Sequence, residues 1–117
     1  MTAAATIATA EEVLAGRVAV PVHLRVITAA HLARCALEHA ITAALEARGQ
    51  QLPRANGRSR LIVLRVLDEV AGAHAGHAWD GLSRACHRHA FELPPSEAEV
   101  RALLDDVRGV LMTMTAG

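Results

Sequence analysis

The side chains best suited to chemistry in this chain are its histidines, of which there are seven among 117 residues. Four of them gather with one of the two cysteines between positions 74 and 89: His74, His77, Cys86, His87 and His89. A neutral imidazole can accept a proton near neutral pH, so such a cluster suits general acid or general base catalysis. We therefore expect any functional site to lie in this part of the chain.

One short motif inside this cluster places an arginine and a histidine at a defined spacing. In the stretch from Ser83 to Phe91, SRACHRHAF, four residues separate Arg84 from His89, and an aromatic side chain follows. The motif resembles the signature of the HEPN (higher eukaryotes and prokaryotes nucleotide-binding) superfamily, whose members are small four-helix domains that dimerise. The resemblance implies a helical fold that covers nearly the whole chain.

The same resemblance implies an activity and a set of roles. Many members of the superfamily are metal-independent ribonucleases, including toxins that pair with a nucleotidyltransferase antitoxin. By position, Arg84 would hold a phosphate and His89 would act as the general base toward a ribose hydroxyl, with His87 and Arg88 in supporting or phosphate-binding roles. The implied partners are RNA or a nucleotide, a second copy of the chain, and an antitoxin or larger effector protein. The toxin members usually carry Tyr where this chain has Phe91.

The spacing of the motif limits how one chain could use it. On a regular helix, Arg84 and His89 would point about 140° apart, because five steps of about 100° separate them. They can meet at one phosphate only where the helix breaks or where a second subunit completes the site. The resemblance implies the second of these arrangements, a homodimer in which two-fold pairing assembles the site, and a local break in the helix is the alternative.

A second interpretation of these side chains is a zinc site. His31, Cys35 and His39 recur every four residues, a spacing that places ligands on one helical face. Two further pairs stand three residues apart: His74 with His77, and Cys86 with His89. Since the candidates are scattered over three predicted helices without a paired-cysteine motif, we expect neither a metal nor another cofactor.

A third interpretation is a non-enzymatic interaction or dimerisation module. An alanine-rich seam on the longest predicted helix and the face that carries Trp79 would then mediate self-association or docking onto a larger protein. Arg84 and Arg88 would form exposed ion pairs, because Arg84, Arg88 and Glu92 follow one another at four-residue steps.

A separate group of basic residues lies away from the histidine cluster. It consists of Arg54, Arg58, Arg60 and Arg65. These side chains could bind nucleic-acid phosphates, although no aromatic residue is interleaved with them to stack on bases. Basic residues at a helix start oppose the helix dipole, which indicates that an anion or an acidic partner compensates them.

Composition favours a single helical domain. The hydrophobic share is 52%, supplied mainly by Ala, Leu and Val, with one Phe, one Trp and no Tyr, and such small or unbranched side chains favour close helix packing. Twelve basic and twelve acidic residues cancel, so no overall field would attract nucleic acid or a membrane. Two cysteines on separate predicted helices indicate no disulfide framework, and the sequence shows neither a signal peptide nor a membrane span. We expect a cytoplasmic protein.

Hydrophobic periodicity and capping residues predict where the helices lie. Residues 1–8 are predicted to be a disordered tail, and a short helix is predicted to begin with Thr9 as its N-cap. Residues 22–48 should form the longest helix, ending at Gly49, and its seam has alternating steps of four and three: Val26, Ala30, Ala33, Leu37, Ala40 and Ala44. A loop should follow over residues 50–59.

The second half of the chain should contain three helices. One begins at Arg60 and loosens over residues 71–76, where two glycines fall, and the next runs from about His77 to Glu92. Pro94 and Pro95 should end that helix. Ser96 and Glu99 form a capping box for the last helix, whose predicted core face is Val100, Leu103, Leu104, Val107, Val110 and Leu111. The whole should be one all-α domain, an antiparallel up-and-down bundle of about four helices.

Overall fold

The computed structural model describes residues 2–87 and 93–115, and all regular secondary structure in these ranges is helical. The elements are α1 (Ala3–Leu14), the short 3-10 turn η1 (Val22–Leu24), α2 (Arg25–Ala47), α3 (Gly57–Leu67), α4 (Glu69–Cys86) and α5 (Glu97–Thr115). The predicted all-α fold class is therefore confirmed over the described residues. No helix in the described part is both long enough and apolar enough to cross a membrane.

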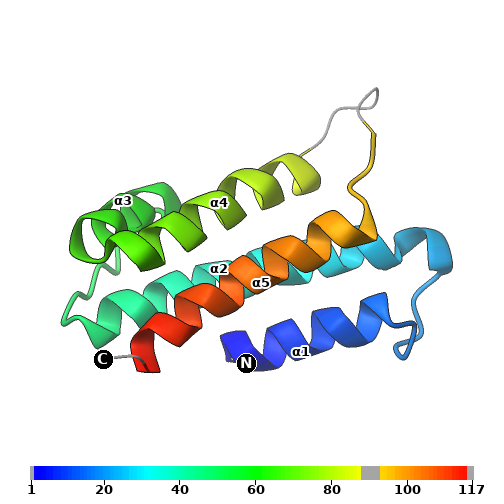
Figure 1. The fold of residues 1–117 in the computed structure, drawn as a ribbon, viewed down its shortest axis with the longest axis horizontal. Coiled ribbons are helices and arrows are strands. Elements are labelled where there is room, and N and C mark those ends of the chain that lie inside the picture. Colours follow the sequence, from blue (N-terminus) through cyan, green and yellow to red (C-terminus); the bar gives the residue numbers. More distant parts are fainter. Residues whose placement is uncertain (1, 88–92, 116–117) are drawn as a thin grey trace.

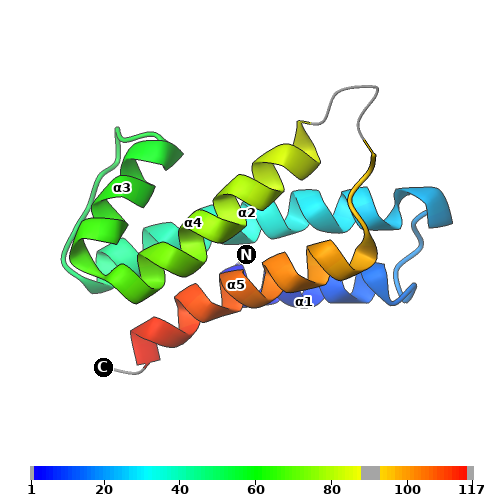
Figure 2. The same ribbon diagram turned by 45° about the horizontal axis from the view of Figure 1, so that its top comes forward.

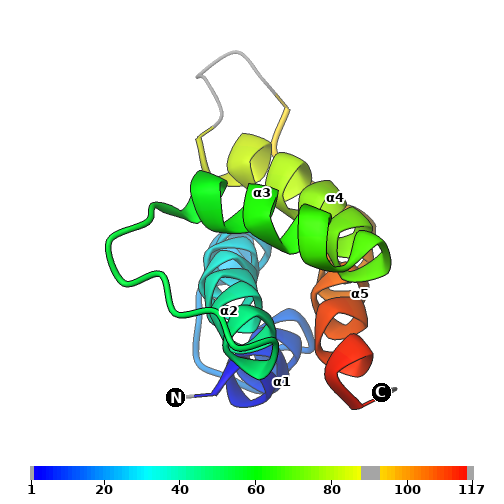
Figure 3. The same ribbon diagram turned by 90° about the vertical axis from the view of Figure 1, so that its left-hand side faces the viewer.

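Helix α2 is the element around which the others pack. It contacts α1, α3, α4 and α5, and α4 also packs against both α3 and α5. The longer helices run alternately in opposite directions, while α3 crosses over one end of α4 (Figures 1 and 3). Helices α4 and α5 diverge toward the C-terminal end of α4 (Figure 2).

The alanine-rich seam of α2 forms the centre of the core. Five predicted seam residues have no exposed surface: Ala30, Ala33, Leu37, Ala40 and Ala44. Their short side chains let neighbouring helices approach closely, and this explains why one helix can touch four others. Because the seam is buried inside one chain, it is not available for the self-association that the interaction-module interpretation assigned to it.

The N-terminal segment is more ordered than its sequence indicates. Helix α1 begins at Ala3, capped by Thr2, whose Oγ1 accepts a hydrogen bond of 3.1 Å from the backbone N–H of Ala5. Thr9 lies inside the helix and its hydroxyl donates to the carbonyl of Ala5. The predicted tail over residues 1–8 is therefore wrong for its described part, because Ala3 and Ile7 are buried in the core.

The boundary between the two helices that follow the loop lies at Asp68, and not at Gly72 and Gly76, where the helix was predicted to loosen. Asp68 has extended backbone angles and its Oδ1 accepts a 3.0 Å hydrogen bond from the N–H of Ala71, so it ends α3 and caps α4. Its carboxylate also pairs with Arg48. The Ala71 N–H and then Arg48 lower the pKa of Asp68. The stabilisation from this ionised group is therefore present above about pH 4 and is lost as the pH falls through the lower folded pKa.

The glycines predicted to loosen the chain instead allow two helices to touch. A Cβ atom on Gly72 would stand 2.6 Å from the Cα of Arg65, so α3 lies directly against the backbone of α4 at this point. The helix predicted over residues 77–92 is wrong at its N-terminal bound, because α4 already begins at Glu69. Helix α4 ends at Cys86, and residues 88–92 of the predicted helix lie outside the described part of the chain.

Helix α5 follows its prediction. The Oγ of Ser96 accepts a 3.0 Å hydrogen bond from the N–H of Glu99, as expected of the cap. The predicted core face is buried at five positions: Val100, Leu103, Leu104, Val107 and Val110. Helix α5, held in place by these buried side chains, forms one wall of the candidate site.

Candidate functional site

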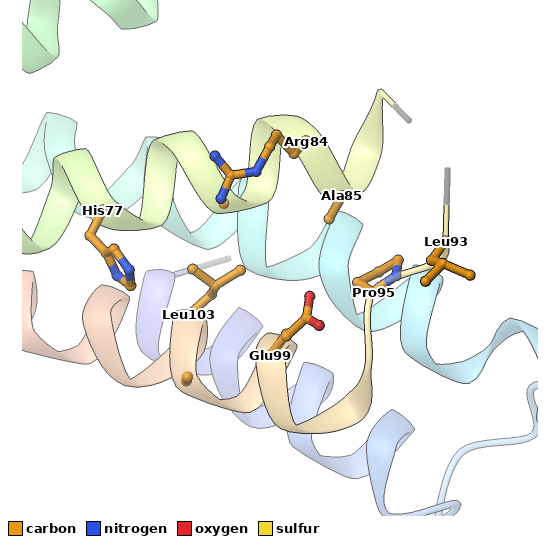
Figure 4. A pocket seen from close by; sticks show the side chains of 9 residues that line it. His77, Arg84, Ala85, Leu93, Pro95, Glu99 and Leu103 are labelled. Atoms are coloured by element: carbon orange, nitrogen blue, oxygen red, sulfur yellow. The ribbon is translucent and has the colours of Figure 1, made fainter. Parts of the chain in front are cut away.

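A cleft of about 400 Å³ opens between the C-terminal half of α4 and the N-terminal half of α5. Its lining residues are His77, Gly81, Arg84, Ala85, Leu93, Pro95, Glu99, Ala102 and Leu103 (Figure 4). The polar groups come from both helices, whereas the remaining wall is largely aliphatic. A concave surface with a few converging polar groups is the usual form of a small ligand or substrate site.

His77 stands at one end of this cleft and is oriented by a carboxylate. Its Nδ1 is hydrogen-bonded to Oδ2 of Asp106, which projects from α5 and whose side chain is only 18% exposed. An ionised carboxylate accepts but cannot donate, so Nδ1 must carry the proton. The lone pair of His77 then lies on Nε2, which leaves that atom able to accept a proton from a bound molecule.

The same carboxylate also binds a second imidazole. Nδ1 of His74 lies 3.2 Å from Oδ1 of Asp106. The ring of His74 rests above Gly109 on α5, where an added Cβ would stand 2.8 Å from the ring. Asp106 therefore bridges two histidines that are one helical turn apart, and of the two only His77 lines the cleft.

Arg84 provides the positive charge of the cleft. It lies seven residues after His77, nearly two full turns, so both side chains project from the same face of α4. The guanidinium extends back along α4 toward His77 (Figure 4). Within the described residues Arg84 makes no ion pair or hydrogen bond, so its donors are available to an anion.

Glu99 supplies the opposite charge from the facing wall. Its carboxylate points from the first turn of α5 toward α4 (Figure 4). The backbone N–H of Glu99 is already bonded to Ser96, and this bond fixes the position of the residue. The cleft thus presents one imidazole, one guanidinium and one carboxylate to a molecule that enters it.

The structure describes two of the four site residues that were predicted from the motif, Arg84 and His87. Arg84 lies in the cleft, and His87 is the exposed C-cap of α4. Arg88 and His89 lie outside the described residues, so their assigned roles stay predictions. His77 belonged to the histidine cluster but had no assigned role, and Asp106 was missed because its partners lie about thirty residues earlier in the chain.

The ligands proposed for zinc do not come together in the described structure. His31, Cys35 and His39 are all exposed on α2. Burial raises the pKa of the Cys86 thiol, which disfavours the thiolate that a metal requires. Among residues 2–87 and 93–115, no three His, Cys, Asp or Glu side chains are arranged to hold a metal ion.

The α4–α5 cleft combines an imidazole oriented by a carboxylate with a guanidinium that has no partner among the described residues. An imidazole alone would fit many reactions, and a guanidinium that lines the same cleft would suit an anionic group such as a phosphate. No protein-family model matches the sequence, and neither the curated proteins nor the solved structures contain a match to it.

Proposed function

We propose that this chain binds RNA and cleaves it without a metal ion in the cleft between α4 and α5. The observation that carries the proposal is the placement of His77 and Arg84 on the α4 wall of one cleft, with His77 oriented by Asp106 from α5. Arg84 binds the scissile phosphate through parallel N–H donors, and His77 is within the cleft that such a phosphate would occupy.

The cleavage that this arrangement supports is an internal transfer at phosphorus. Nε2 of His77 takes the proton of the ribose 2′-hydroxyl, and the 2′-oxygen then attacks the phosphorus atom. The bond from phosphorus to the 5′-oxygen breaks, and the leaving oxygen takes a proton from water, whose hydroxide is neutralised by the proton that the imidazolium of His77 then releases. The products are a 2′,3′-cyclic phosphate and a 5′-hydroxyl. Asp106 stabilises the imidazolium that forms, and Glu99 can accept a hydrogen bond from a ribose hydroxyl.

This proposal keeps part of what the HEPN resemblance implies. Arg84 retains the phosphate-binding role that the motif assigns to it. The general-base role of His89, with support from His87 and Arg88, remains a second proposal for the same reaction. The two proposals differ in what the site needs. The His77 site needs only one chain, whereas the His89 site requires pairing with a second chain or a break in the helix.

The first test measures cleavage of single-stranded RNA in the presence of EDTA, with detection of the cyclic phosphate end. Arg84→Gln should lower kcat/KM by roughly tenfold to a hundredfold, because a charge-assisted hydrogen bond contributes about 1.5–3 kcal/mol. Arg101→Gln is the matched control, since Arg101 is an exposed arginine of α5 that pairs with Glu97 outside the cleft. Intact RNA, or equal rates in the two variants, would contradict the proposal.

We further propose that α1, α2, α4 and α5 act as an antiparallel up-and-down bundle and that α3 presents a surface for a second copy of the chain. Four large apolar side chains lie exposed on and just after α3: Ile62 (55%), Val66 (81%), Leu67 (45%) and Val70 (62%). Exposed apolar groups this close in sequence favour a protein interface. The four side chains themselves carry no charge, and the exposed charged residues between them, Arg65 and Glu69, have opposite signs.

Placing a charge in this patch should break the dimer. Val66→Asp is expected to weaken self-association by roughly tenfold or more, because burying a carboxylate without a partner is costly. Val22→Asp is the control, since Val22 is similarly exposed (73%) but lies in η1. Sedimentation equilibrium measures the difference. Equal self-association of the two variants, or a monomeric parent protein, would refute the α3 interface.

The exposed α3 patch also favours one alternative function. A chain that dimerises through this patch but leaves RNA intact would be a non-enzymatic interaction module. An antitoxin or a larger effector protein would then be the kind of partner to seek.

A further inference from the structure

A second cavity lies on the other flank of α4 and is independent of the proposed ribonuclease site. It measures about 450 Å³ and is enclosed by α2, the loop before α3, the first turn of α3 and the middle of α4. Its polar and aromatic lining consists of Arg34, Glu38, Asn56, Arg58, Arg60 and Trp79. None of these residues lines the α4–α5 cleft.

The charge in this cavity is unbalanced. Three arginines line it, Arg34, Arg58 and Arg60, against a single acidic residue, Glu38, which pairs with Arg34. The cavity also lies at the N-terminus of α3, which carries the positive end of the helix dipole and has no acidic residue in its first turn. Like charges gathered in this way destabilise the fold unless an anion joins them.

Arg34 is positioned at the cavity by three contacts with the chain. Its guanidinium lies over the ring of Trp79, 4.4 Å from the ring centroid, and its Nη1 donates to Oγ of Ser83 at 3.3 Å. Its Nε is buried without a hydrogen bond and lies 3.5 Å from Oε1 of Glu38, with which it forms an ion pair. A ligand in the cavity would therefore meet the outer N–H groups of this guanidinium and not its buried Nε.

The other two arginines differ in their contacts: Arg60 is bonded to the chain, and Arg58 has no partner among the described residues. Arg60 donates through Nε and Nη2 to the carbonyl of Leu52, at 3.3 and 2.9 Å, and so holds the loop that closes the cavity. Arg58 makes no ion pair or hydrogen bond with any described residue. Asn56 caps the helix by accepting from the N–H of Ser59, which fixes the backbone that carries Arg58.

We infer that this cavity binds the phosphate group of an organic phosphate. Arg58 and the outer N–H groups of Arg34 bind the phosphate oxygens at the N-terminus of α3, and Glu38 accepts a hydrogen bond from a hydroxyl of the same molecule. The volume exceeds what a bare phosphate fills, so a larger molecule such as a nucleoside monophosphate fits better. A phosphate of a nucleic-acid chain offers the same chemistry, and the experiment below separates the two sources.

Trp79 provides a direct readout, because it is the one tryptophan in a chain without tyrosine and it lines the cavity. Tryptophan fluorescence is followed during titration with sodium phosphate, adenosine 5′-monophosphate and a short single-stranded DNA, each at constant ionic strength set with chloride. DNA is used because it lacks the 2′-hydroxyl and therefore cannot be cleaved by the proposed reaction.

The expected result is a saturable change that Arg58→Gln weakens by roughly tenfold to a hundredfold, since one charge-assisted contact is lost. Arg54→Gln is the matched control, because Arg54 is an exposed arginine of the loop before α3 that does not line the cavity. Saturation by the monophosphate identifies a small ligand, and saturation by DNA alone identifies a chain phosphate. No saturation with any probe, or equal weakening in both variants, overturns the inference. Loss of RNA cleavage would leave this result unaffected.

Discussion

His77→Asn lowers the rate of RNA cleavage by about a hundredfold to ten-thousandfold, the usual effect of removing a general base, and leaves RNA affinity nearly unchanged. The side chain of His77 is 69% exposed and its described polar contact is with Asp106 alone, so the fold does not depend on it. Arg84 still binds the phosphate in this variant, and the loss therefore appears in kcat and not in KM.

The matched control is His74→Asn. His74 binds the same carboxylate from the same helix but does not line the cleft, so its loss should change the rate little. Asp106→Asn should lie between the two, since it leaves Nε2 of His77 in place but no longer stabilises the imidazolium. His77→Asn cleaving at the parental rate would refute the assignment. Loss of activity in His89→Ala alone would instead support the roles implied by the HEPN resemblance.

The parts of the fold that the sequence predicts best are those set by local contacts. The start of α5 depends on Ser96 bonding to an N–H three residues away, and its core face depends on spacing within one helix. The end of α2 at Gly49, whose φ is +76°, follows from the freedom of glycine to adopt a left-handed conformation. Such features involve neighbours in sequence, so a pattern alone reveals them.

Features set by distant contacts were predicted poorly. Helix α1 begins earlier than predicted because Ala3 and Ile7 are buried in the core, a contact that the sequence pattern does not show; the Thr2 cap is a local signal that the prediction missed. The break at Asp68 is stabilised by Arg48, twenty residues away, while the glycines that seemed to be a break are tolerated because α3 packs on them. The candidate site also depends on distant contacts. His77 can be singled out by its residue type, but the orientation of its ring depends on Asp106, which lies on another helix.

The contact between α3 and α4 leads to the second large expected effect, a loss of stability in Gly72→Ala. An alanine elsewhere inside a helix stabilises it by about 1 kcal/mol relative to glycine. At Gly72, however, the new Cβ would stand 2.6 Å from both Cα and Cγ of Arg65, and a backbone atom cannot move aside without shifting α3. Overpacking of this kind costs about 1–3 kcal/mol, and it should exceed the gain in helix propensity.

Gly76→Ala is the matched control for this effect, because it changes a glycine of the same helix that faces the same arginine. Its new Cβ would meet the guanidinium end of Arg65, which can rotate away, so stability should be unchanged or higher by up to about 1 kcal/mol. Urea unfolding followed by circular dichroism measures both variants, and equal stabilities would show that α3 does not lie against α4 at Gly72. Since α3 carries both Arg58 of the second cavity and Val66 of the proposed interface, its displacement in Gly72→Ala should also weaken phosphate binding and dimerisation. Gly76→Ala should preserve both, which separates a shift of α3 from a general loss of helix packing.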